Sequence, residues 1–129
     1  IIWQTGKKNF DDITKKILEE MSVLPDNLVL QPYIDKMHLA LLSSDLVISR
    51  AGSLSLSEIS ASGAASILVP YPNAAANHQR INAKYFVEMG ACIYLEDKEL
   101  EPNKLRETIN LLLDNPIKMN YLKQKNTHF

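Results

Sequence analysis

Short apolar runs alternate with longer segments of helical period along this chain, and that alternation constrains the fold more than any other feature. The runs are rich in β-branched residues or leucine and are too short for helices. This pattern is typical of repeated βα units that build a mainly parallel sheet. The sequence therefore predicts an α/β fold of Rossmann-like type, with strands at residues 1–4, 28–31, 46–49, 66–70 and 92–95.

The segments between these runs carry apolar stripes at helical spacing, and each stripe predicts one buried helix face. Gly63 and Gly90 each follow such a segment, where a left-handed C-terminal cap is expected. Pro102 suits a first helical turn, and Pro116 separates the last two helices. The three stripes are Phe10, Ile13, Ile17 and Met21; Ile81, Tyr85 and Met89; and Leu105, Ile109 and Leu112.

Composition excludes several classes of function. The 129 residues suit one domain, and 14 basic against 15 acidic residues give a net charge of −1. No broad basic field is therefore available to hold nucleic acid or an anionic membrane. A single cysteine, Cys92, allows neither an intrachain disulfide nor a cysteine-based metal cluster, and it favours a reducing, cytoplasmic compartment. The apolar runs are far shorter than the roughly 20 residues of a membrane-spanning helix.

The segment after the run at 46–49 has the features of a phosphate site. A glycine turn at Gly52 leads into a predicted helix whose first residues include Ser53 and Ser55. Free backbone N–H groups and the helix dipole attract an anion there. Glu58 lies about one turn further, where its carboxylate can accept hydrogen bonds from a ribose diol. The spacing Ser55-x-x-Glu58 also matches a capping box that binds nothing, and the two interpretations carry equal weight.

The segment after the run at 66–70 enters a helix whose first turn has neutral hydrogen-bonding side chains: His78, Gln79 and Asn82. Amides and an imidazole suit sugar hydroxyls, which need both donors and acceptors. An ordinary first turn with Asn77 as its N-cap explains the same residues. The chain has no Walker loop, G-x-G-x-x-G fingerprint, nucleophile elbow or metal-ligand set, so the sequence predicts no metal, no cofactor and no catalytic base.

These motifs resemble the C-terminal half of the MurG family, the UDP-N-acetylglucosamine transferases that convert lipid I to lipid II in peptidoglycan synthesis. The resemblance extends to about residue 115 and is carried by residues 4–7, 33–37, 44–59, 69–72 and 77–83. It implies one half of a metal-independent, inverting glycosyltransferase of the GT-B type. The family usually has two glutamines where this chain has His78-Gln79.

Carried over by position, the resemblance assigns ten donor-binding residues. Backbone groups of Ile34 would meet the uracil edge, and Met37 would pack near the base. Ser55 would meet the diphosphate and Glu58 the ribose hydroxyls, while Arg50 and Gly52 shape the turn beside Ser53. The sugar hydroxyls would face His78, Gln79 and Asn82.

The resemblance also implies what lies outside the sequence. Residues 1–129 would form the UDP-sugar donor-binding domain without its first strand-loop-helix unit. An N-terminal domain would hold the lipid I acceptor, the general base and the membrane-facing patch, so this chain alone would be inactive. The full-length enzyme would be a peripheral protein on the cytoplasmic face of the bacterial inner membrane, with roles in cell shape and cell division.

Two alternatives remain open from the sequence. One is a non-catalytic UDP-sugar-binding subunit of a split transferase, which would dock on a separately encoded partner. The other is a sugar-nucleotide 2-epimerase, which shares a similar segment from glycine to glutamate. The blocks at residues 33–37 and 78–79 follow the transferase more closely than the epimerase.

Overall fold

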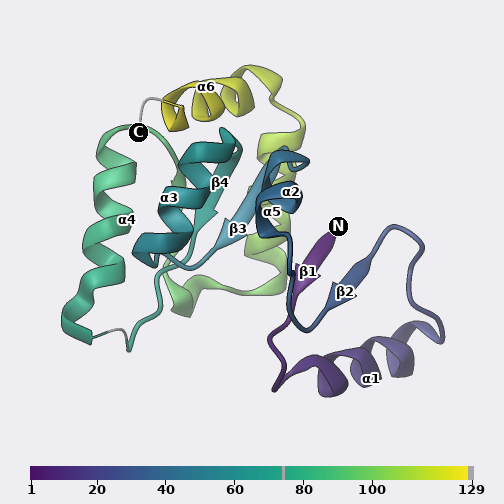
Figure 1. Cartoon of the computed structure of the whole chain (residues 1–129). Helices are drawn as coiled ribbons and strands as arrows, with labels where there is room; N and C mark the ends of the chain where they lie inside the picture. The colour runs from purple at the N-terminus through teal and green to yellow at the C-terminus, as the bar shows by residue number, and fades with distance from the viewer. Residues whose placement is uncertain (74, 128–129) are drawn as a thin grey trace. The chain divides into compact units, whose positions relative to one another are not determined.

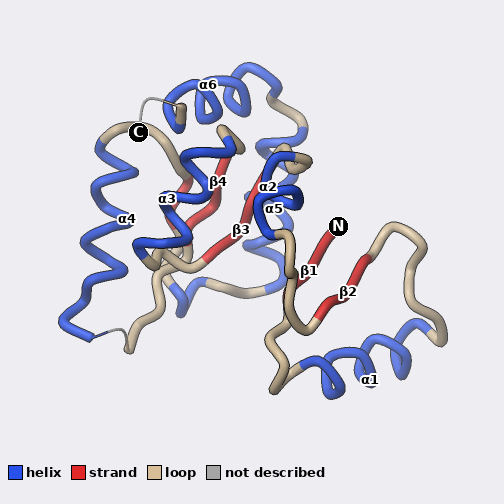
Figure 2. The backbone as a smooth tube through the Cα atoms, in the orientation of Figure 1, coloured by secondary structure: helices blue, strands red, loops and turns tan. Residues whose placement is uncertain are grey.

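The chain divides into two compact units, residues 1–40 and 41–129. The computed structural model describes residues 1–73 and 75–127. Figure 1 traces the helices and strands in chain order, and Figure 2 colours them by type. Each unit is α/β with parallel strands, as the alternation of apolar runs and helical segments predicts.

The first unit is one β-α-β crossover. Strand β1 (Ile2–Gln4) leads into helix α1 (Phe10–Met21), and β2 (Val29–Gln31) returns parallel to β1 with Trp3 opposite Leu30. The amide of Thr5 extends this pairing by donating to the carbonyl of Gln31 at 3.0 Å. Helix α2 (Met37–Leu42) begins in this unit and ends in the second.

The prediction that the apolar stripe of α1 forms a buried face is wrong, because none of its residues is buried. Phe10, Ile13 and Ile17 are only half-buried, and Met21 is 56% exposed. A unit of two short strands and one helix has little surface with which to cover an apolar stripe. The stripe therefore locates the helix but overstates its burial.

The second unit contains a three-stranded parallel sheet in the order β3-β4-β5. Its strands are β3 (Leu46–Ser49), β4 (Ala65–Leu68) and β5 (Ile93–Tyr94). The described strands thus pair within each unit, β1 with β2 and β3-β4-β5 with one another. The other elements are α3 (Ser53–Ser62), η1 (Ala75–Asn77), α4 (His78–Glu88), η2 (Asp97–Glu99), α5 (Pro102–Leu113) and α6 (Pro116–Asn126).

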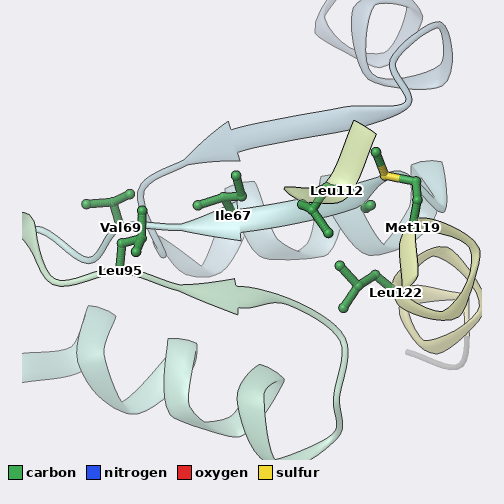
Figure 3. Close-up of a cluster of buried hydrophobic side chains, with 7 residues drawn as sticks. Ile67, Val69, Leu95, Leu112, Met119 and Leu122 are labelled. Carbon is green, nitrogen blue, oxygen red and sulfur yellow. The ribbon is translucent and has the colours of Figure 1, made fainter. Parts of the chain in front are cut away.

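Strand β4 is the centre of the core because every one of its residues is buried. Side chains alternate between the two faces of a strand, so Ala65, Ile67 and Val69 share one face. That face packs against Leu112 of α5, Met119 and Leu122 of α6, and Leu95, as Figure 3 shows. Leu105 and Ile109 pack against the same cluster, which confirms the predicted face of α5.

The predicted buried face of α4 is wrong. Ile81 is 61% exposed, Tyr85 is 55% exposed and Met89 is also exposed, whereas the buried residues of the helix are Ala83 and Phe86. Large apolar side chains at spacing i, i+4 mark a stripe, but they do not show which side of the helix meets the sheet. Here a small alanine lies on the packed side.

The predicted helix ends are confirmed. Gly63 and Gly90 both have a φ of 68°, the left-handed conformation that glycine adopts without strain. Pro102 and Pro116 occupy the first turns of α5 and α6. No helix within residues 1–73 and 75–127 combines the length and hydropathy needed to span a bilayer.

Candidate functional site

The candidate site lies at the carboxyl edge of the β3-β4-β5 sheet. Because these strands are parallel, the loops that follow them emerge at the same edge, where α/β sheets bind ligands. Eight of the ten predicted residues follow β3 or β4 and belong to this second unit. Ile34 and Met37 belong to the first unit.

The start of α3 presents unpaired backbone donors. Gly52 is the N-cap, and its carbonyl accepts the first helical hydrogen bond, from Leu56 N at 3.0 Å. The amides of Ser53, Leu54 and Ser55 therefore precede the first intrahelical donor. Within residues 1–73 and 75–127, no side chain forms a capping hydrogen bond at this end of the helix. Three N–H groups and the positive end of the helix dipole are left for an anion.

The capping-box interpretation of Ser55 and Glu58 is wrong. A capping box needs its serine at the N-cap, and that position is occupied by Gly52. Ser55 is the third residue of the helix and Glu58 the sixth, so both side chains project from helical backbone. Glu58 is exposed to solvent and Ser55 is half-buried. Neither side chain caps the helix start, so a role in binding a ligand remains for both.

Gly52 is not required by the local fold. Its φ is −66°, a conformation open to every residue, and a Cβ placed there meets its nearest neighbour, Ser55 Oγ, at 3.9 Å. That distance is an ordinary van der Waals contact. The glycine therefore leaves open space beside the free amides of α3, and a close-approaching ligand would use that space.

The first turn of α4 is tied to neighbouring loops. Gln79 Oε1 accepts a hydrogen bond from Tyr71 N at 2.9 Å, and Asn82 Nδ2 donates to the carbonyl of Ala51 at 3.2 Å. His78 is exposed. Asn77 is the N-cap, as expected, but it adopts a left-handed φ of 58° and its side chain makes no capping bond. Gln79 is thus held through its amide oxygen, whereas His78 faces solvent.

Arg50 connects all three loops of this edge. Its Nη1 donates to the carbonyls of Val69 at 3.2 Å and Pro70 at 3.4 Å, and it forms an ion pair with Asp97. The guanidinium also lies 5.5 Å from the ring centroid of Tyr71. One side chain from the loop after β3 thus holds the loop after β4 and pairs with the segment after β5.

A second polar cluster next to Arg50 was not found from the sequence. Arg80 of α4 pairs with Glu96 at 3.0 Å, and Tyr94 donates to the other carboxylate oxygen at 2.8 Å. The hydrogen bond from Tyr94 lowers the pKa of Glu96, and the nearby arginine adds to this effect. Burial and the adjacent carboxylate raise the pKa of Tyr94. These partners are 16 and 2 residues apart, and no sequence motif marks them.

In the first unit, the backbone of Ile34 is already engaged. Its N–H donates to Gln4 Oε1 at 2.8 Å. A nucleobase that accepts a hydrogen bond from this N–H must therefore displace the side-chain amide of Gln4. Met37 is the first residue of α2 and is half-buried. Both residues lie on the segment that follows β2.

A groove of about 690 Å³ lies between α3 and α4. Ser53 and Asn82, two of the predicted residues, line it, and the hydroxyl of Ser60 is buried there with no hydrogen-bond partner in the described part of the chain. The other lining residues are Leu56, Ser57, Ala61, Ile81, Tyr85, Phe86 and Thr127. Across residues 1–73 and 75–127, His, Cys, Asp and Glu do not gather in any group of three that could bind a metal ion.

The parallel sheet, the uncapped helix start and the polar first turn of α4 together define the class of α/β domains that occurs as one half of GT-B type glycosyltransferases. The family model "Glycosyltransferase family 28 C-terminal domain" matches residues 1–129, and the chain belongs to this family. This confirms the predicted family and fold class.

Individual relatives agree with the family. The chain is 41% identical over 119 residues to the UDP-N-acetylglucosamine--N-acetylmuramyl-(pentapeptide) pyrophosphoryl-undecaprenol N-acetylglucosamine transferase of Carboxydothermus hydrogenoformans, covering 92% of this chain and 31% of that protein. It is 39% identical over 121 residues to the protein of the same name from Caldanaerobacter subterraneus, covering 94% and 33%. The crystal structure of Acinetobacter baumannii MurG matches with a TM-score of 0.80 and 29% identity, covering 99% of this chain and 36% of that one. The chain spans about a third of the length of the curated relatives it matches.

Proposed function

We propose that this chain is the donor-binding part of an inverting glycosyltransferase that moves N-acetylglucosamine from UDP-N-acetylglucosamine to lipid I, forming lipid II. The observation that carries the proposal is the uncapped start of α3, where Gly52 is the N-cap and Ser55 and Glu58 lie within the helix. The reaction itself is inferred from family membership and from the names of the similar transferases.

The diphosphate of the donor would bind at the start of α3. When the acceptor hydroxyl attacks the anomeric carbon, the bond to the diphosphate breaks and negative charge grows on the departing UDP. The amides of Ser53, Leu54 and Ser55, together with the helix dipole, would stabilise that charge. Fixed dipoles need no reorganisation as the charge develops, so they favour the transition state over the bound donor.

The remaining predicted residues would recognise the rest of the donor. Glu58 is exposed three residues beyond Ser55, on the same side of the helix, and would accept hydrogen bonds from the ribose diol. His78, Gln79 and Asn82 would face the sugar hydroxyls. Ile34 and Met37 of the first unit would serve the uracil base.

In this proposal, residues 1–129 form a donor-binding domain without its first strand-loop-helix unit. A further domain would bind lipid I, supply the general base and contact the membrane. The complete hexosyltransferase would then work as a peripheral protein on the cytoplasmic face of the bacterial inner membrane. This chain by itself would bind donor without transferring sugar.

Calorimetry with UDP and with UDP-N-acetylglucosamine tests the proposal. The chain is expected to bind both ligands, and Glu58→Ala is expected to weaken binding by about 1.5 to 3 kcal/mol, the usual contribution of hydrogen bonds to a charged group. Glu107→Ala, at an exposed glutamate of α5, is the matched control and should bind like the parent. Absence of binding to the unchanged chain, or equal affinity for both variants, would contradict the proposed site.

A further inference from the structure

The contacts around Arg50 form a closed ring that includes three of the predicted site residues. Arg50 Nη1 donates to the carbonyls of Val69 and Pro70, and the next residue, Tyr71, donates its N–H to Gln79 Oε1. Three residues further along α4, Asn82 Nδ2 donates to the carbonyl of Ala51, which adjoins Arg50 in the sequence. The ring thus links the loop after β3, the loop after β4 and the first turn of α4.

Asp97, in the segment after β5, forms an ion pair with Arg50 of this ring. It is the first residue of η2, 47 residues from Arg50, and its carboxylate forms an ion pair with Arg50 Nη1. The same nitrogen holds the two loop carbonyls, so the carboxylate fixes the donor that binds them. A capping box between Glu96 and Glu99 supports the η2 turn itself.

The carbonyls that Arg50 holds need a fixed donor. Val69 and Pro70 are both buried, and a buried carbonyl without a partner is costly. Arg50, whose side chain is 44% exposed, has several N–H groups and can turn toward solvent or a ligand anion unless something holds it. A carboxylate beside Nη1 keeps the guanidinium over the loop.

We propose that Asp97 is a positioning residue for the donor site. It holds Arg50 against the Val69 and Pro70 carbonyls and so fixes the turn at Ala51 and Gly52, from which α3 begins. Asp97 does not touch the donor, and Arg50 acts on the loops rather than on the diphosphate. This inference rests on the proposed function, because its effect is read as binding of UDP.

The test compares Asp97→Asn, Asp97→Glu and the control Asp114→Asn, at an exposed aspartate after α5. Asp97→Asn should weaken UDP binding by about two- to thirty-fold, the range for residues that act on a site through others. Asp97→Glu should recover most of the affinity, and Asp114→Asn should match the parent. Uridine, which has no diphosphate, should bind Asp97→Asn and the parent equally.

The melting temperature separates positioning from general support of the fold. The ion pair is partly exposed and adds little stability, so Asp97→Asn should melt within a few degrees of the parent. A double variant with Arg50→Gln should bind UDP no more weakly than Arg50→Gln alone, since Asp97 acts through Arg50. Full UDP affinity in Asp97→Asn, or equal losses for UDP and uridine, would overturn the inference. If the parent itself fails to bind UDP, the proposed function is wrong instead.

Discussion

Replacing Ser55 with alanine separates a ligand-binding role from a helix-capping role. If Ser55 capped α3, its loss would destabilise the protein by about 0.5 to 2 kcal/mol. Gly52 is the N-cap, however, and Ser55 is the third helical residue. Inside a helix, alanine is more favourable than serine by up to about 0.5 kcal/mol. The structure therefore predicts unchanged or slightly increased stability for Ser55→Ala.

Urea unfolding followed by circular dichroism measures this difference. Trp3, the single tryptophan, lies in the first unit, so its fluorescence does not report on α3, whereas the helical signal does. With a slope of about 2 kcal/mol per molar urea, the midpoint should rise by no more than about 0.25 M. A lost cap of 1 kcal/mol would instead lower the midpoint by about 0.5 M.

The same variant should lose affinity for UDP. A hydroxyl that donates to a charged phosphate contributes about 1.5 to 3 kcal/mol to binding. Its loss should therefore raise the dissociation constant for UDP roughly ten- to 150-fold. The reasoning is refuted if Ser55→Ala lowers the urea midpoint by about 0.5 M and binds UDP like the parent. That pair of results would restore the capping box.

Three further predictions concern the core and its ionisable groups. Leu112→Ala removes a fully buried side chain from the cluster on β4 and should cost about 2 to 5 kcal/mol in a urea titration; a loss below 1 kcal/mol would contradict the packing. Burial raises the pKa of Cys92 to about 12, so a thiol reagent at pH 8 should label it only after urea is added, and rapid labelling of the native protein would contradict this. Because the pKa of Glu96 is lowered from 4.5, chiefly by Tyr94, its contribution to stability is present above pH 4.5 and is lost as the pH falls further. Glu96→Gln should therefore show a shallower loss of stability between pH 4.5 and 2, and identical acid-unfolding curves would argue against the effect.

The order of the elements was predictable from the sequence because hydrophobic runs and breakers act locally. The strands around Leu46 and Ile67 lie within two residues of their predicted bounds. Gly63 and Pro102 end and begin helices where their backbone preferences require. These signals depend only on nearby residues, so they survive without knowledge of the tertiary structure.

Burial was less predictable, because it depends on what each helix meets. The stripe of Ile81 and Tyr85 is exposed, while Ala83 on another side of α4 has no exposed surface. A hydrophobic pattern shows where apolar side chains gather, but small residues that allow close packing leave no such mark. The order of the strands likewise depends on pairing between segments that are far apart in the sequence.

The candidate site was predictable in its local motifs and not in its long-range contacts. The segment from Gly52 to Glu58 predicted both a helix start and an anion site. The sequence did not show, however, whether the helix begins after Gly52 or whether Ser55 is its N-cap. Only the backbone identifies Gly52 as the N-cap. The pairing of Arg50 with Asp97, 47 residues apart, has no local signal at all.

Mapping UDP onto the amides of the ¹⁵N-labelled chain tests the central claim most directly. The claim predicts that UDP shifts the resonances of Ser53, Leu54 and Ser55, which lack intrahelical acceptors, together with those of the first turn of α4. Glu58→Ala should reduce these shifts at the same UDP concentration. If UDP leaves the start of α3 unchanged, or shifts only residues far from this edge of the sheet, such as Leu122 of α6, the donor site is not where this account places it.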